Sequence, residues 1–328
     1  MSGRTWLGLV FGAVAAALTN GALAQDFPTR PITLVVSFAP GGLSDVPARF
    51  LAAEMQERIG QSIIVENKPG ASGITGGSYV WRAPPDGYTL LVSAISEVQN
   101  LHYLPVPYNA ITDFAQVGKI ADGPALVLIV NANSSYKSVS DLIADAKKND
   151  GKFNFATSGP ATSPAIAVDQ FNALAGTNIV PVPYKGTGPA AAAVLSGEVQ
   201  GAFVFYPSAK GLADAGKVRI LAVASAKRTA YMPDIPTMTE VGFKNFVHSA
   251  FVGLAAPRNT PPQVIAVLNR YLNETVNSPS FQKRIEQFGM VAPSQPNTPD
   301  TFAKFLSTET AFQAELAKLS RPSQPNVK

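Results

Sequence analysis

Ser37-Phe38-Ala39-Pro40-Gly41-Gly42-Leu43-Ser44-Asp45 joins an apolar run to a helical pattern, and this stretch decides the fold of the chain. The preceding run, Ile32–Val36, predicts a strand, and the pattern that begins near Val46 predicts a helix. The first turn of a helix has unpaired backbone N–H groups and carries the positive end of the helix dipole. Glycines let a ligand approach such a backbone closely, so this turn is a candidate seat for a carboxylate or a phosphate.

The alternation of β-rich runs and helical stretches continues beyond this turn. One cycle covers residues 32–92, a second covers residues 125–224, and helical patterns dominate from residue 262 onward. Strands that alternate with helices at this spacing favour βαβ units and mainly parallel sheets. A chain of 328 residues suggests about two domains. The sequence therefore predicts an α/β protein with two domains.

Three further loops share the design of the first one. Residues 67–73, 157–164 and 183–188 each follow a predicted strand, are rich in Gly, Ser or Thr, and open a predicted helix. In open α/β sheets, ligands gather at the carboxyl ends of the strands, where such loops lie. The phosphate-loop and dinucleotide-binding glycine motifs are absent. The four loops favour a small organic carboxylate over a nucleotide, although each loop alone is also consistent with an ordinary capped connection.

Acidic, aromatic and hydroxyl side chains of these segments are the candidate ligand contacts. Asp45 has three open roles: it caps its helix, it orients the glycine turn, or it pairs with a cationic group of the ligand. The aromatic side chains of Phe38, Tyr184, Phe205 and Tyr206 are candidate walls of a site, with core packing as the alternative. The hydroxyl candidates are Ser37, Ser44, Ser72, Thr157, Ser158, Thr162 and Ser163. The segment Ser93-Ala94-Ile95-Ser96, after the third strand, is a further candidate lining segment.

The first 24 residues have the pattern of a secretory signal peptide. Arg4 gives a positive start, an apolar run extends from Trp6 to Leu18, and Ala22-Leu23-Ala24 is a small-residue cleavage signal. The apolar run is shorter than the ~20 residues that span a bilayer. We therefore expect export with cleavage after Ala24, and not an uncleaved membrane anchor.

Composition and charge argue against several other classes. The chain has no cysteine, so it has no disulfide framework, and its formal net charge is +4. The basic residues are scattered, so the charge is a mild bias toward anionic ligands, and we predict no nucleic-acid partner. The two histidines, His102 and His248, lie far apart, and neither a nucleophile elbow nor a metal-spaced cluster occurs. We predict no catalytic residue, no metal and no cofactor.

Ala39-Pro40-Gly41-Gly42, followed by Asp45 and Ala48-Arg49, resembles the opening motif of the tripartite tricarboxylate transporter receptors, the Bug-type solute-binding proteins. One block departs from that family, because Pro164-Ala165-Ile166-Ala167 stands where His-Leu-Ala often follows. Further blocks that are similar to the family follow in order, so that the resemblance extends over nearly the whole mature chain: residues 65–73, 84–90, 182–190, 219–223, 233–242 and 257–269.

The resemblance implies a two-lobed, type II-like periplasmic-binding-protein fold that closes on a small carboxylate: a di- or tricarboxylate, an amino acid or an aromatic acid. Lobe 1 would comprise residues 25–124 and 225–328, and lobe 2 residues 125–224, each lobe a mainly parallel sheet flanked by helices. We expect a periplasmic monomer that delivers its ligand to a membrane permease. The resemblance places Ala39, Gly41, Gly42, Asp45, Ser72 and Gly73 on the first lobe, facing Thr157, Ser158, Thr162 and Ser163 on the second.

An enzyme or a signalling sensor built on the same fold is the alternative function, because a fold does not fix an activity. The scarcity of catalytic groups favours a receptor that works by hinge closure.

Overall fold

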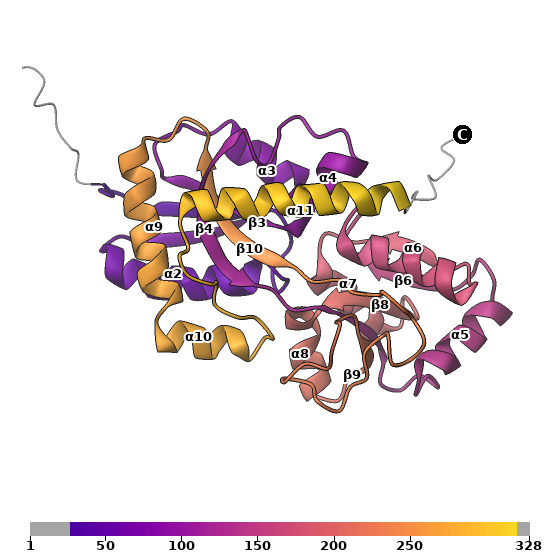
Figure 1. Ribbon diagram of the computed structural model, residues 1–328. Coiled ribbons are helices and arrows are strands. Elements are labelled where there is room, and N and C mark those ends of the chain that lie inside the picture. Colours follow the sequence, from indigo (N-terminus) through magenta and orange to yellow (C-terminus); the bar gives the residue numbers. More distant parts are fainter. Residues whose placement is uncertain (1–26, 320–328) are drawn as a thin grey trace, which may run out of the picture.

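The computed structural model describes residues 27–319, which form two five-stranded sheets flanked by helices (Figure 1). The predicted signal peptide, residues 1–24, lies outside the described residues. The strand order of the first sheet is β2 (Ile63–Asn67), β1 (Ile32–Val36), β3 (Thr89–Ala94), β10 (Phe251–Pro257) and β4 (Phe114–Asp122). The order of the second sheet is β7 (Val180–Pro183), β6 (Asn154–Thr157), β8 (Gly201–Phe205), β5 (Leu126–Asn131) and β9 (Val218–Val223).

One strand in each sheet runs against the other four. β10 pairs antiparallel with β3 and β4, and β5 pairs antiparallel with β8 and β9. The remaining pairings, those of β1 with β2 and β3 and of β6 with β7 and β8, are parallel. The sheets are therefore mixed and not simply parallel. The reason is that β5 and β10 are each the first strand after the chain arrives from the other sheet. They begin at the edge where the other strands end, so they run in the opposite direction.

Helices cover both sheets, and their boundaries follow ordinary sequence signals. For example, helix α2 (Asp45–Ile59) is capped by Gly60, which adopts a left-handed conformation with φ 72°. No helix within residues 27–319 is both long and apolar enough to cross a membrane. The helices that accompany the first sheet are α2 (Asp45–Ile59), α3 (Ile74–Trp81), α4 (Ile95–Tyr103), α9 (Pro262–Val276), α10 (Pro279–Glu286) and α11 (Pro299–Leu319). Those of the second sheet are α5 (Val139–Lys148), α6 (Ser163–Ala175), α7 (Thr187–Ser196) and α8 (Tyr206–Asp214).

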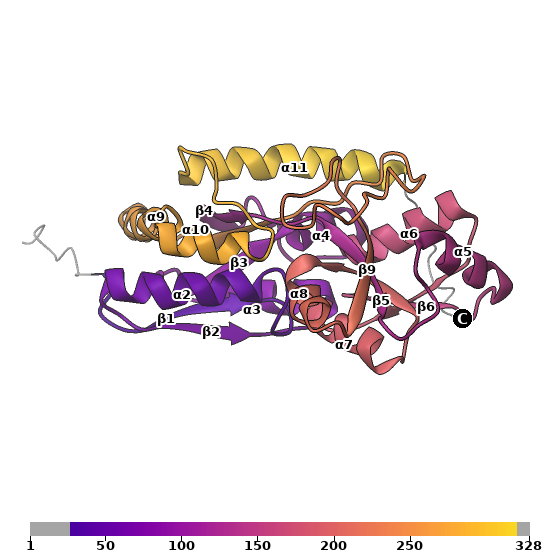
Figure 2. The ribbon, with the colours of Figure 1, turned by 90° about the horizontal axis from the view of Figure 1, so that it is seen from below.

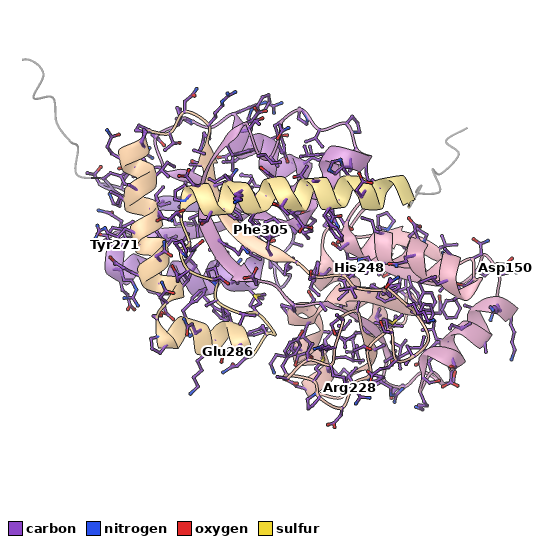
Figure 3. The ribbon with its side chains drawn as sticks, viewed as in Figure 1. Asp150, Arg228, His248, Tyr271, Glu286 and Phe305 are labelled. Carbon is purple, nitrogen blue, oxygen red and sulfur yellow. The ribbon has the colours of Figure 1, made fainter. Side chains whose placement is uncertain are left out.

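The long C-terminal helix α11 lies across the first sheet and points toward α6 of the second lobe (Figures 1 and 2). Its aromatic side chains hold it in place, because the Phe305 ring (Figure 3) lies 5.0 Å from that of Phe251 and the Phe302 ring lies 5.9 Å from it. Edge-to-face ring pairs of this kind add to the apolar burial. α11 also packs along α4, which begins at the edge of the first sheet that faces the second lobe.

The chain crosses between the sheets twice, and the two crossings lie side by side. The Gly123 N–H donates to the Ala250 carbonyl at 2.8 Å, and the Leu126 N–H donates to that of His248 at 3.1 Å. Residues 225–247 precede the return crossing and pack on the second sheet, with the Phe243 ring stacked 4.9 Å from that of Phe171. We therefore propose that the second lobe extends to about residue 248, beyond the boundary expected at residue 224.

Candidate ligand-binding site

A cavity that opens to solvent lies between the two lobes, and the space between its lining atoms, open solvent included, is about 370 Å³. Ten of the residues predicted from the sequence line it: Phe38, Gly42, Ser44, Ala94, Ile95, Ser96, Ser158, Thr162, Ser163 and Phe205. The lining residues that were not predicted as contacts are Leu43, Gln99, Pro164 and Thr187. Among these residues none carries a charged side chain.

Five helices of the described chain begin at this cavity. The cap residues of α2, α4, α6 and α8 are Ser44, Ala94, Thr162 and Phe205, and all four line it. The first residue of α7, Thr187, lines it as well. Each helix start offers unpaired N–H groups and a partial positive charge. The helices of both lobes therefore make the cavity attractive to an anion without any cationic side chain.

The first loop is held by the carboxylate of Asp45, which is buried and does not line the cavity. Asp45 Oδ2 accepts hydrogen bonds from the Gly41 N–H and from Arg49 Nε, both at 2.9 Å. Asp45 Oδ1 accepts from Arg49 Nη2 and from Asn67 Nδ2, again at 2.9 Å. The Asn67 amide also donates to the Phe38 carbonyl at 2.9 Å. The carboxylate is thus occupied by four protein donors, which favours the orienting role among the three roles considered.

The second loop contributes to closure of the cleft. Ser72 has a left-handed backbone with φ 57°, and its hydroxyl donates to the Pro160 carbonyl of the second lobe at 2.7 Å. The Asn100 side chain donates to the Ser72 carbonyl at 2.9 Å and fixes this conformation. Gly73 lies under the first loop, because a Cβ there would stand 3.2 Å from the Phe38 ring. Ser72 and Gly73 therefore border the cleft without lining the cavity itself.

Three further hydrogen bonds join the lobes in this closed form. The Ala39 N–H donates to the Lys185 carbonyl at 2.9 Å. The Ser208 hydroxyl is 3.1 Å from the Gly41 carbonyl. Ser163 of α6 donates to Gln99 Oε1 of α4 at 3.1 Å. The predicted residues Ala39 and Gly41 thus take part in the contact between the lobes.

The remaining predicted residues do not line the cavity. Ser37, Ser93 and Thr157 are buried. The Tyr206 ring packs 4.9 Å from that of Tyr231, and Tyr184 packs against the apolar cluster of the second lobe.

The segment 93–96 was predicted to line the site, and residues 94–96 do so. Behind them stands Glu97, a buried carboxyl group on α4. Its Oε2 accepts from the Ala94 N–H at 2.8 Å and from the Ser96 hydroxyl at 3.0 Å, which caps the helix. Burial raises the pKa of Glu97 above its usual range.

Comparison with known proteins identifies the family. Residues 47–318 match the model of the family described as "Tripartite tricarboxylate transporter family receptor". The chain belongs to this family. Over 289 residues it is 35% identical to Protein BugT of Bordetella pertussis, and the match covers 87% of this chain and 88% of BugT. The resemblance seen in the sequence motifs is thereby confirmed.

Solved structures of this receptor family share the two-lobed fold. MatC from Rhodopseudomonas palustris, solved with bound malate, superposes with a TM-score of 0.83 at 30% identity and covers 88% of this chain and 99% of its own. A second R. palustris protein, solved with adipate, gives a TM-score of 0.83 at 31% identity, with coverage of 89% and 97%. The predicted two-lobed α/β architecture of a solute-binding receptor is therefore confirmed.

Proposed function

We propose that this receptor captures a small organic carboxylate in the cavity between its lobes and retains it by hinge closure. The observation that carries the proposal is the convergence of five helix N-termini on a cavity whose lining is uncharged. Such a site stabilises negative charge through backbone N–H groups and hydroxyls. The apolar side chains of Phe38, Leu43, Ile95 and Phe205 suit the carbon skeleton of the acid.

The relatives support this ligand class. MatC was solved with malate and the second R. palustris protein with adipate, and both are carboxylates. We further propose that the chain works in the periplasm as a monomer, after removal of its leader, and hands its ligand to a permease of the tripartite tricarboxylate type. The family description, a transporter receptor, supports that partner.

We propose that the protein binds its ligand without transforming it. The lining hydroxyls of Ser158, Thr162 and Ser163 have no histidine, lysine or carboxylate beside them in the cavity wall. The carboxyl group beside the Ser96 hydroxyl is that of Glu97, which is buried and caps its own helix. A serine or threonine hydroxyl needs such a base to become a nucleophile. This argument favours the receptor over an enzyme on the same fold.

Calorimetric titration with a panel of carboxylates tests the proposal. The panel contains mono-, di- and tricarboxylates, hydroxy acids, amino acids and aromatic acids, and amines and sugars of similar size serve as controls. We expect at least one acid to bind, and small-angle scattering to report a more compact protein in its presence. The recovered acid should be chemically unchanged. Turnover of the acid, or binding of amines in place of acids, would overturn the proposal.

A further inference from the structure

We propose that the cavity prefers an acid that bears a hydroxyl group over the matching dicarboxylate, and that Glu309 on the surface helix α11 sets this preference. The inference rests on the proposed function, because it specifies the ligand class of the same cavity. The directions of the hydrogen bonds in the cavity wall carry it.

A chain of hydrogen bonds runs from α11 to the cavity. Gln313 Nε2 donates to Glu309 Oε1 at 2.8 Å, one turn earlier on the same helix. Gln99 Nε2 on α4 donates to Gln313 Oε1 at 3.4 Å. Ser163 Oγ on α6 donates to Gln99 Oε1 at 3.1 Å. Gln313, Gln99 and Ser163 are 5%, 3% and 2% exposed, so water does not compete for these bonds.

The carboxylate of Glu309 fixes the direction of the whole chain. An ionised carboxylate only accepts hydrogen bonds, so Gln313 must turn its amide nitrogen toward Glu309 and its oxygen toward Gln99. Gln99 must then present its nitrogen to Gln313 and its oxygen to the cavity wall at Ser163. The orientation of an amide, which is otherwise ambiguous, is thus determined by its partners.

The neighbouring hydroxyls of the second lobe also donate their hydrogen bonds to other protein atoms. Ser158 donates to Thr162 Oγ1 at 3.0 Å, and Thr162 donates to the Gly159 carbonyl at 2.7 Å. Pro164, in the first turn of α6, has no N–H to offer. With those of Gln99 and Ser163, the side chains of this part of the wall present mainly lone pairs to a ligand. We call it the accepting wall: Gln99, Ser158, Thr162 and Ser163.

A free hydroxyl proton lies elsewhere in the lining. The Ser44 hydroxyl, at the start of α2, makes no hydrogen bond to the described protein and does not cap its helix. Thr187 Oγ1 lies 2.8 Å from the Ser208 hydroxyl, whose single proton is also within reach of the Gly41 carbonyl at 3.1 Å, so Thr187 is not a free donor. Ser44, with the N–H groups of the helix starts, forms the seat for the carboxylate of the ligand.

A second carboxylate has no proton to donate, so at the accepting wall it would meet lone pairs. A hydroxyl group of the ligand can instead donate a hydrogen bond to the side-chain oxygen of Gln99 or of Ser163. An ammonium group would find only neutral oxygens in the lining, without a carboxylate to balance its charge. The directions of the hydrogen bonds therefore select a hydroxy acid.

The experiment compares matched acids by calorimetry on the full mature chain. The probes are 4-hydroxybutyrate, succinate and butyrate, and the six-carbon set 6-hydroxyhexanoate, adipate and hexanoate. In each set the hydroxy acid and the diacid differ only in the terminal group. We expect the hydroxy acid of at least one set to bind about tenfold or more tighter than its diacid, a ratio that corresponds to one well-made hydrogen bond.

The variant Glu309→Gln tests the origin of the preference. A glutamine at position 309 can donate as well as accept, so Gln313 and Gln99 are free to turn over and offer an N–H to the cavity. We expect the ratio between hydroxy acid and diacid to fall several-fold. A purely structural role of Glu309 would weaken all probes alike and leave the ratio unchanged. Glu57→Gln, the same substitution at an exposed position of α2, is the matched control and should keep the wild-type ratio.

The outcomes separate this inference from the proposed function. Tighter binding of succinate and adipate than of the hydroxy acids would overturn the inference and leave the carboxylate receptor intact. An unchanged ratio in Glu309→Gln would overturn the role of α11. Failure of the probes and of every acid in the wider panel to bind would overturn the proposed function itself.

Discussion

The Asp45 carboxylate accepts a hydrogen bond from the Gly41 N–H at 2.9 Å, and this bond closes the glycine turn of the first loop. Gly41 has φ +81°, a conformation that glycine adopts without strain. Arg49 and Asn67 donate three further hydrogen bonds to the same carboxylate. Asp45 thus fixes the conformation of the loop from the side away from the cavity, whereas Gly42 and Ser44 line the cavity.

Asp45→Asn should weaken every ligand by the same factor. The amide cannot accept from Gly41, Arg49 and Asn67 together, so the turn loosens, at a cost on the order of 1 to 3 kcal/mol in the free energy of unfolding. Urea denaturation measures that cost, and calorimetry with butyrate and 4-aminobutyrate measures the binding. A loss confined to the amino acid would show instead that Asp45 touches the ammonium group.

Gly188→Ala should prevent full closure of the lobes. A Cβ at Gly188 would lie 2.6 Å from the Pro40 carbonyl oxygen, a backbone atom of the opposite lobe that cannot move aside without moving its loop. We expect at least tenfold weaker binding of the acid identified in the panel, together with a larger radius of gyration in its presence by small-angle scattering. Gly211→Ala is the matched control, because this glycine of α8 has open space around it. Unimpaired closure in Gly188→Ala would show that the lobes meet differently.

Much of the fold could be predicted because its signals are local. The strand-loop-helix units around the first loop, and the helices that begin with proline, follow from apolar periodicity and from turn residues. The helical pattern predicted from residue 262 onward contains α9, α10 and α11 of the structure. These signals need no knowledge of contacts far along the chain.

The elements that were missed depend on distant contacts. β10 is wholly buried between β3 and β4, so it lacks the alternation of a half-exposed strand and was not predicted. α4 begins directly where β3 ends, so no glycine-rich loop in the sequence marks the start of this helix. Because of this, Gln99 on α4 was left out of the predicted contacts, although residues 93–96 before it were named. Phe205, a predicted aromatic wall, lines the cavity at a direct junction of β8 and α8. Thr187 begins α7 at the end of a predicted loop but was not among the predicted contacts, and the packing of the two lobes reveals it.

Glu97→Gln should change the pH dependence of stability. Burial raises the folded-state pKa of this carboxyl group, so its neutral form is favoured in the folded protein. Its contribution to stability is present below the ordinary pKa of glutamate, about 4.3, and is lost as the pH rises from there through the raised folded value. A glutamine has no such proton to lose, so the variant should gain stability relative to wild type as the pH rises above about 4. Melting temperatures over a pH series measure the difference, and a constant difference across the series would contradict the assignment.

His248 should make the region of the crossings sensitive to acid. It lies where the chain returns from the second lobe (Figure 3), with its ring 5.0 Å from that of Phe246, and burial lowers its pKa to about 4. The Gln170 amide nitrogen donates to the Asn245 carbonyl at 3.3 Å, so its oxygen faces His248 and accepts from Nε2 at 2.8 Å.

The neutral imidazole is therefore the form that the folded protein prefers. Its contribution to stability is present above the ordinary pKa of 6.5 and is lost as the pH falls through the folded value of about 4. We expect the wild type to lose on the order of 2 kcal/mol over this window relative to His248→Gln, which retains a donor for Gln170 but does not titrate. Urea denaturation at pH 7 and at pH 4.5 measures both proteins. Parallel losses in the two would mean that other groups, and not this histidine, govern the response to acid.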